Sequence, residues 1–112
     1  MIDGNIYRNI THIAGGSIRK PNGELLDLTD KQVEFFLKKV GAPVIILYKS
    51  SVGDSPAIVI PEQGTGQYKV TFKPDETVWI KDGIYEYGVI VRDQTAIVYA
   101  GGGKIRVLTT GG

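Results

Sequence analysis

His12 is the only histidine in the sequence, and hydrolysis by a serine or threonine would require it beside that nucleophile and a carboxylate. The Gly-x-Ser-x-Gly turn that often presents a nucleophilic serine is absent. Ser17, Ser50, Ser51 and Ser55 fall instead in segments with turn composition. We therefore expect no enzymatic activity and interpret His12 as an ordinary strand or surface residue.

Metal binding is not indicated by the spacing of the acidic residues, because none follows the Asp-x-Asp-x-Asp-Gly pattern of calcium loops. With no cysteine and one histidine, a zinc site also lacks its usual ligands. Asp27 and Thr29 are better explained as residues that hydrogen-bond within a turn. We therefore expect no metal or cofactor. The acidic residues compared with the calcium pattern are Glu24, Asp27, Asp30, Asp54, Asp75, Glu76 and Asp82.

Three consecutive glycines, Gly101 to Gly103, precede Lys104 and raise the question of phosphate binding. A phosphate loop needs a strand, then glycines, then a helix whose N-terminal N–H groups hold the anion. The residues that follow here, KIRVLTT, have a β pattern instead. The glycines therefore predict a bulge or a loose turn, and so does GTGQ at 64–67.

Aromatic side chains are the only chemically distinctive residues that are enriched in the sequence. Trp79, Tyr85, Tyr87 and Tyr99 could serve as stacking platforms for a carbohydrate. However, Tyr85 and Tyr87, like Tyr68, lie on the apolar side of a predicted strand, where they would belong to the core. Trp79 is also a natural core residue in a sandwich that has no disulfide. Core or protein-interface roles are therefore the favoured interpretation of these aromatics.

The composition is that of one globular domain covering residues 1–112. The 13 basic and 12 acidic side chains nearly cancel, and no basic tract exists to contact a row of phosphates, so nucleic acid is not an expected partner. No apolar run approaches the roughly 20 residues that span a bilayer. The first ten residues lack the features of a signal peptide, which points to synthesis or assembly in a cytoplasm.

Alternating and short apolar segments with glycine-rich turns predict an all-β sandwich of about seven to eight strands. The clearest alternation is at 67–73 and 84–92, and two continuous apolar runs, 44–49 and 57–60, fit strands buried on both sides. Further strands are expected in THIAGGSIRK, with a bulge at its glycine pair, and in TAIVYA and KIRVLTT. The ends, about 1–5 and 109–112, are expected to be loosely ordered.

The segment LTDKQVEFFLKKVGAP supports two local structures. Thr29 and Gln32 could form a capping box, and apolar residues follow at helical spacing, which favours a short helix at 30–40. Val33, Phe35 and Leu37 also alternate with polar or outward positions, which favours a strand. Local pattern alone leaves both structures open.

The strand predicted at 84–92 has two faces. One face contains Tyr85, Tyr87, Val89 and Val91 and is expected to point into the core. The other face is not fully polar, so it is either covered or meets a partner. We therefore designate it the candidate assembly face. Its residues are Ile84, Glu86, Gly88, Ile90 and Arg92.

Two long stretches resemble immunoglobulin-like β-sandwich domains of tailed-phage virion proteins, and the baseplate upper protein N-terminal domain family is the nearest. PNGELLDLTDKQVEFFLKK, at 21–39, resembles the family's turn, Leu-Asp-Leu-Thr and following Val-x-Phe-x-Leu-Lys strand. GTGQYKVTFKPDETVWIKDGIYEYGVIVRD, at 64–93, is similar to the second half of the domain. The matched residues there are Gly66, Tyr68, Asp75, Thr77, Gly83, Tyr85 and Tyr87.

The resemblance spans about residues 15–109, and it implies that 31–39 is a strand. Two features depart from the family pattern: Asp30 stands where a glycine is usual, and the loop YKSSVGDSPA has no distinctive counterpart. In this architecture, a tyrosine near the start of the penultimate strand often tethers the corner before it, and Tyr85 is suitably placed. The candidate corner and core residues are Asp27, Thr29, Tyr68, Thr77, Trp79, Gly83, Tyr85 and Tyr87.

For function, the resemblance implies a non-enzymatic structural component of a tailed-phage virion, in the tail, baseplate or fibre-attachment apparatus. Its partners would be other virion proteins in multiple copies, and it would be assembled in the cytoplasm of the bacterial host. Head decoration is the alternative within the same class. Carbohydrate binding at the host surface is the alternative from a different class.

Overall fold

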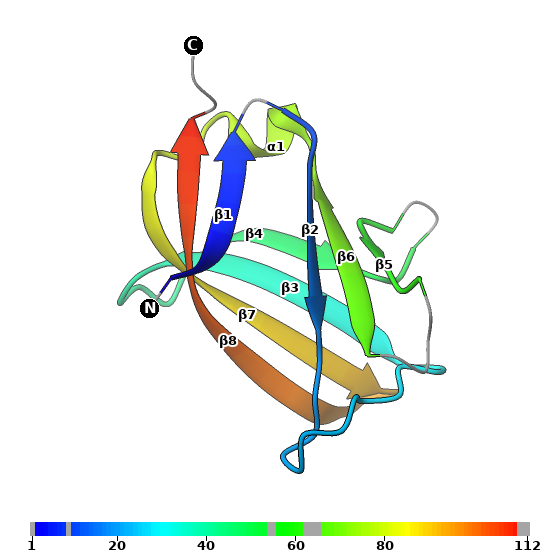
Figure 1. Cartoon of the computed structure of the whole chain (residues 1–112). Coiled ribbons are helices and arrows are strands. Elements are labelled where there is room, and N and C mark those ends of the chain that lie inside the picture. The colour runs from blue at the N-terminus through cyan, green and yellow to red at the C-terminus, as the bar shows by residue number, and fades with distance from the viewer. Residues whose placement is uncertain (1, 9, 54–55, 62–65, 110–112) are drawn as a thin grey trace.

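The chain forms a two-sheet β-sandwich of eight described strands, which confirms the predicted all-β sandwich fold (Figure 1). The computed structural model describes residues 2–8, 10–53, 56–61 and 66–109, without the side chains of residues 2 and 3. The elements are β1 (Ile2–Arg8), β2 (His12–Ser17), β3 (Gln32–Lys39), β4 (Ile45–Ser50), β5 (Ile58–Val59), β6 (Gln67–Phe72), α1 (Pro74–Thr77), β7 (Gly83–Asp93) and β8 (Ala96–Thr109).

The larger sheet has the strand order β1-β8-β7-β3-β4, and the smaller one has the order β2-β6-β5. The first strand pairs in parallel with the last, and every other pairing between the described strands is antiparallel. The pairs β3–β4, β5–β6 and β7–β8 each stay within one sheet, and the connections β1–β2, β2–β3, β4–β5 and β6–β7 cross from one sheet to the other. In Figure 1, β1 and β2 belong to different sheets and approach each other near the top of the view, where the Tyr7 ring meets that of His12.

Residues 32–39 form strand β3, so the helix considered for this region is wrong and the strand is confirmed. Val33, Phe35 and Leu37 are buried, while the residues between them point outward. β3 lies between β4 and β7 in the sheet, and these long-range pairings outweigh the local helical pattern. Asp30 adopts a left-handed backbone conformation (φ 58°) in the preceding turn, which aspartate tolerates and which the family's glycine would adopt freely.

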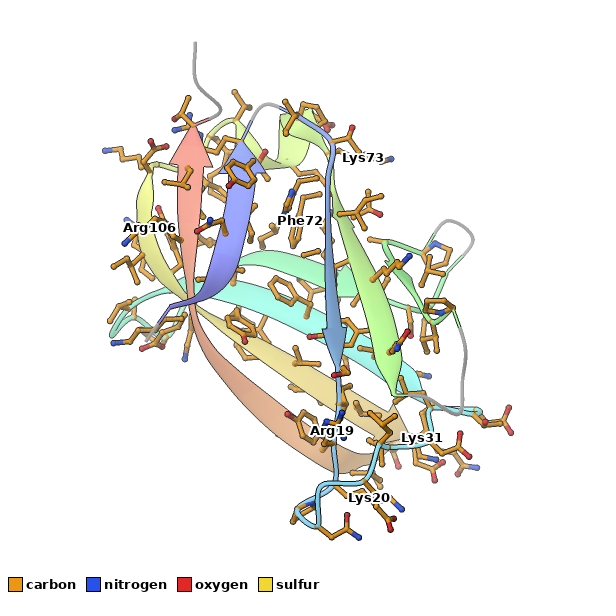
Figure 2. All side chains as sticks on the ribbon, viewed as in Figure 1. Arg19, Lys20, Lys31, Phe72, Lys73 and Arg106 are labelled. Carbon is orange, nitrogen blue, oxygen red and sulfur yellow. The ribbon has the colours of Figure 1, made fainter. Side chains whose placement is uncertain are left out.

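Phe35 lies at the centre of the core. Its ring meets Phe72 of the opposite sheet edge to face, with centroids 5.5 Å apart, and stacks on Tyr87 at 5.8 Å. Phe72 points into the space between the sheets in Figure 2. Trp79 was expected to fill the core, but it is 56% exposed. This expectation is wrong because the β3 phenylalanine already occupies the centre, leaving the indole on the turn after α1.

The corner between the two sheets is closed by Tyr85. Its hydroxyl donates a hydrogen bond to the Lys81 carbonyl oxygen at 2.7 Å, while its ring is buried. Gly83 begins β7 directly before it, and Thr77, at the end of α1, is fully buried beneath the same connection. The hydrogen bond fixes the turn against the strand that follows, as tyrosines do at this position of immunoglobulin-like domains.

Replacing Tyr85 with phenylalanine is expected to lower the free energy of unfolding by about 1 kcal/mol, because the Lys81 carbonyl loses its donor while the ring stays in place. Urea denaturation of the two proteins measures the difference. Tyr99→Phe is the matched control, since among the described residues the Tyr99 hydroxyl has no hydrogen-bond partner. Equal losses in the two variants would contradict a specific role for Tyr85.

The glycines at 101–103 and 15–16 lie within regular strands, so the bulge or loose turn predicted for them is wrong. In GTGQ, Gly66 lies in the turn before β6, and residues 64–65 lie outside the described part of the chain. Residues 101–103 pair in register with 87–89, and β8 runs unbroken from Ala96 to Thr109. Residues 15–16 likewise pair in register with 68–69. Glycine is used here for space: a Cβ on Gly16 would collide with the Tyr68 ring.

Two further expectations about the strands are corrected. The runs at 44–49 and 57–60 are not buried on both sides, because β4 and β5 lie at the edges of their sheets and Val59 is half exposed. Residues 2–5, expected to be loosely ordered, belong to β1, which is held by its parallel pairing with β8. Thr109 ends β8, while residues 1 and 110–112 lie outside the described part of the chain.

Candidate functional site: the outer face of the five-stranded sheet

The candidate assembly face lies on the outer side of the five-stranded sheet. Tyr85, Val89 and Val91 of β7 are buried in the core, and the alternate residues point outward. Ile84 is the most exposed apolar member, at 45%, and Ile90 is partly covered. The strand alternation in the sequence thus assigned each side chain of β7 to the side on which it lies.

Gly88 lies in the middle of this face, under the ring of Phe36 from the neighbouring strand β3. A Cβ on Gly88 would collide with that ring. Gly102 of β8 opposes Gly88 on the other side, and a Cβ there would collide with the Tyr87 carbonyl oxygen. Two adjacent strands therefore come together without side chains at this point: the Phe36 ring covers Gly88, and the backbone of Gly102 is exposed beside it.

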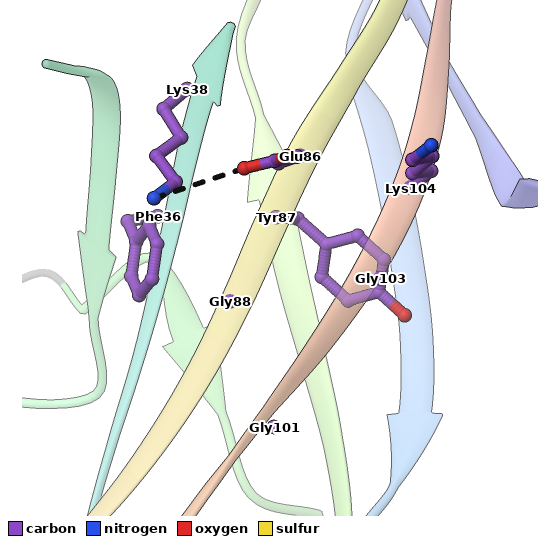
Figure 3. A pocket seen from close by; sticks show the side chains of 8 residues that line it. All are labelled: Phe36, Lys38, Glu86, Tyr87, Gly88, Gly101, Gly103 and Lys104. Atoms are coloured by element: carbon purple, nitrogen blue, oxygen red, sulfur yellow. Dashed lines mark ion pairs between the residues drawn. The ribbon is translucent and has the colours of Figure 1, made fainter. Parts of the chain in front are cut away.

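A shallow groove of about 360 Å³ forms beside Gly88, between β3 and β8 (Figure 3). Lys38 and Glu86 approach each other across its upper end, with their charged atoms 3.8 Å apart. Both side chains are about one-third exposed, so the attraction is screened by water. The groove is lined by Phe36, Lys38, Glu86, Tyr87, Gly88, Gly101, Gly103 and Lys104.

A second group of paired charges lies toward the other end of the face. The Glu34 carboxylate accepts hydrogen bonds from the Tyr48 hydroxyl and from Nε of Arg92. Partial burial acts to raise the pKa of Glu34, but these two donors outweigh it and hold the pKa below its ordinary value. Burial and the nearby Glu34 charge raise the pKa of Tyr48. The carboxylate therefore stays ionised and paired at neutral pH.

The turn before β3 contains Asp27 and Thr29. The Asp27 carboxylate accepts hydrogen bonds from the Thr29 backbone N–H at 2.9 Å and from the Thr29 hydroxyl at 2.6 Å. These bonds lower the pKa of Asp27. Both residues are exposed, so they shape the turn and take no part in the core.

The aromatic residues do not gather into a sugar platform. Tyr85 and Tyr87 point into the sandwich, and Tyr68 and Tyr99 pack against the core. Trp79 alone among the aromatics considered for stacking is exposed. It lines a groove of about 230 Å³ with Lys39, Ile46, Ile80, Lys81 and Tyr85.

The only histidine packs against aromatic side chains. His12 lies between aromatic rings, 5.4 Å from the Tyr7 centroid and 6.3 Å from that of Phe72. Within the described residues, no three His, Asp or Glu side chains are close enough to hold a metal ion. Asp54 and Ser55, two residues weighed for such chemistry, lie outside the described residues.

Sequence reasoning missed the partners that β3 and β4 supply to this face. Glu34 binds Arg92, and Lys38 lies beside Glu86, in each case across neighbouring strands. The signal was present as opposite charges at alternate outward positions of two segments. Using it requires the register of β3 against β7, which the single sequence does not provide.

The chain matches no protein-family model and no curated protein sequence. No helix in the described part of the chain is long and apolar enough to cross a membrane.

Proposed function

We propose that this protein is a non-enzymatic structural module that assembles with other proteins through the outer face of its five-stranded sheet. The observation that carries the proposal is the composition of this face: Ile84, Phe36 and Ile90 lie on it, and two of its charge pairs, Lys38–Glu86 and Glu34–Arg92, form within the chain. A partner can cover these two pairs without burying an uncompensated charge, and an acidic group on the partner would meet Arg106, which lies opposite Ile84.

The sheet also suits assembly because it is a rigid platform. Five hydrogen-bonded strands hold the face, and the core behind it is continuous, so little ordering is needed on binding. A specific interface covers about 800 Å² per partner, which is about the size of a small sheet face. Carbohydrate binding is less favoured. Tyr85 and Tyr87 point inward, so they cannot form a stacking surface for a sugar together with the exposed Trp79.

The more specific proposal is a component of a tailed-phage virion, in the tail, baseplate or fibre-attachment apparatus. It rests on the order of motifs from the Leu-Asp-Leu-Thr turn to the β7 tyrosines, and the immunoglobulin-like sandwich is compatible with it. Its partners would be other virion proteins present in several copies. Its place of assembly would be the cytoplasm of the infected bacterium.

Ile84→Asp is expected to abolish incorporation of a tagged copy into particles, because it places a charge at the apolar part of the assembly face. Incorporation is measured by co-sedimentation of the tag with particles in producing cells. Val59→Asp is the matched control, since Val59 is similarly exposed but lies in the three-stranded sheet. Exclusion of the unmodified chain from particles, or equal incorporation of both variants, would overturn the proposal.

A further inference from the structure

We propose that a second copy of this chain pairs antiparallel with the edge of β4, about a two-fold axis, so that two five-stranded sheets join into one. This inference deepens the proposed assembly function by naming one partner, and it rests on that function for its biological meaning. It uses a different surface, the sheet edge, so either proposal can fail without the other.

Among the strands described, β4 has the sheet edge with the fewest features that prevent pairing. Edges are usually protected by short length, by charged side chains or by a cover. β5 has only two residues, and β1 and β2 contact each other where the Tyr7 ring meets His12. β4 has six residues, and its only charged side chain is Lys49.

Lys49 does not oppose pairing at this edge, although an inward-pointing charge often does. Its side chain is 4% exposed, and its ammonium group already binds the Glu76 carboxylate. The same ammonium lies 5.8 Å from the centroid of the Phe72 ring. The charge is thus buried and compensated within one copy, and a second copy would bury no new unpaired charge.

Exposed apolar side chains flank the β4 edge. A cluster of this kind at a sheet edge is typical of a surface that another chain covers. Trp79 is the largest of them, and aromatic side chains are the commonest anchors of protein interfaces. The side chains, all 51% to 66% exposed, are Val44, Ile45, Tyr48, Val52 and Trp79.

The two ends of β4 differ in charge. Lys39 and Lys81 line the groove beside Ile46, at the beginning of the strand. Neither lysine has an ion-pair partner among the described residues. At the end of the strand, Glu76 of α1 contacts Lys49, and Lys73 lies in the same groove and acts on the Glu76 charge. The exposed Asp75 precedes Glu76 without an ion-pair partner in the described ranges, so this end is less basic than the beginning of the strand.

Antiparallel pairing places the more basic end of each β4 beside the end that holds Asp75. A two-fold axis perpendicular to the sheet places the beginning of one β4 beside the end of the other, and it keeps the inner faces of both sheets on the same side. Lys39 and Lys81 of each copy then approach Asp75 of the other copy. A parallel arrangement would instead bring the lysines of both copies together, which costs free energy.

The geometry also places the axis. Directly opposed residues in an antiparallel pair point to the same face of the sheet. In a symmetric pair, one residue of β4 must therefore lie directly opposite the same residue of the second copy, and the two-fold axis passes midway between the two. The register of β4 against β3 shifts between Leu47 and Ile45 and is regular from Leu47 to Ser50. Within this regular stretch Tyr48 is the exposed residue, and it points to the outer face, so we place the axis there.

Disulfide trapping tests the pairing directly, because the chain has no cysteine of its own. Single cysteines at each position from 45 to 50 are oxidised under mild conditions, and covalent dimer is measured by non-reducing electrophoresis. We expect a maximum at Tyr48→Cys and little dimer at Ser50→Cys, since each residue of offset adds about 7 Å between the paired positions. Ile13→Cys, on an exposed position of β2, is the control and should remain monomeric.

A charge exchange provides the second test, measured as the dissociation constant of the dimer by analytical ultracentrifugation. Asp75→Lys and Lys81→Glu are each expected to weaken self-association about fivefold, and the combined variant should restore it. Uniform cross-linking along β4, or a chain that stays monomeric at every concentration tested, would overturn the β4 proposal. If the monomeric chain still enters particles and the Ile84→Asp variant does not, the proposed assembly function is supported and only the β4 pairing is rejected.

Discussion

Replacing Glu76 with glutamine is expected to lower the free energy of unfolding by about 3 kcal/mol, because it leaves the Lys49 ammonium buried without its counter-charge. Lys49 is almost completely enclosed between β4 and the Phe72 ring, and Glu76 is the residue that reaches it from α1. Glutamine keeps the size of the side chain and removes only the charge. Urea denaturation at neutral pH measures the loss.

A double-mutant cycle separates the ion pair from simple packing. Lys49→Met fills a similar volume without a charge, so it should cost clearly less than Glu76→Gln. The combined variant should be more stable than Glu76→Gln alone, since no charge remains buried. If Glu76→Gln is as stable as the unmodified chain, the pair does not hold α1 against β4.

The same pair predicts an acid-sensitive stability. Partial burial acts to raise the pKa of Glu76, but the Lys49 ammonium and the Lys73 backbone N–H outweigh it, so the folded pKa lies below 4.5, its ordinary value. A carboxyl with a depressed folded pKa stabilises the fold above the unfolded pKa, and this contribution is lost as the pH falls through the folded pKa. The combined Lys49→Met and Glu76→Gln variant should therefore lose less stability than the unmodified chain below about pH 4.5.

Replacing Gly66 with alanine is expected to lower the free energy of unfolding by about 2 to 4 kcal/mol. Gly66 has a left-handed backbone conformation, φ +66°, and is buried beside the 18–26 turn. A Cβ there would lie 2.6 Å from the Ile18 carbonyl oxygen and 3.0 Å from that of Leu26. Because these atoms belong to backbone that is itself hydrogen-bonded, neither can move without breaking a contact. Thermal denaturation measures the effect.

Gly41→Ala is the matched control for this substitution. Gly41 has a similar conformation, φ +79°, but a Cβ there meets no atom within 4 Å. Its loss should reflect backbone strain alone, about 1 kcal/mol. A loss at Gly66 no larger than that at Gly41 would show that the close approach of the two carbonyls does not matter.

Local periodicity was sufficient for β7. Its alternation separated core residues such as Val91 from outward residues such as Ile84, and both lie where the pattern placed them. Alternation predicts faces well because successive side chains of any strand must point to opposite sides of the sheet. The position of Tyr85 two residues after Gly83 was likewise visible as the start of the penultimate strand.

Local periodicity was insufficient at 30–40, where helix and strand patterns coincide. Phe35 is buried because β3 is paired on both sides by β4 and β7, and those partners lie elsewhere in the sequence. The glycines at 101–103 were misread for a related reason. A glycine tract favours a turn locally, but opposite residues 87–89 it allows two strands to approach closely.

The sequence alone determined the all-β class and the faces of its alternating strands, because both follow from interactions between near neighbours in the chain. The tertiary structure decided that Trp79 lies outside, that Lys49 is buried against Glu76, and that β4 is an edge. These outcomes depend on which segments pack together over long separations, and each is a competition for limited core space or pairing positions. Side-chain type and spacing within one segment do not encode the result of that competition.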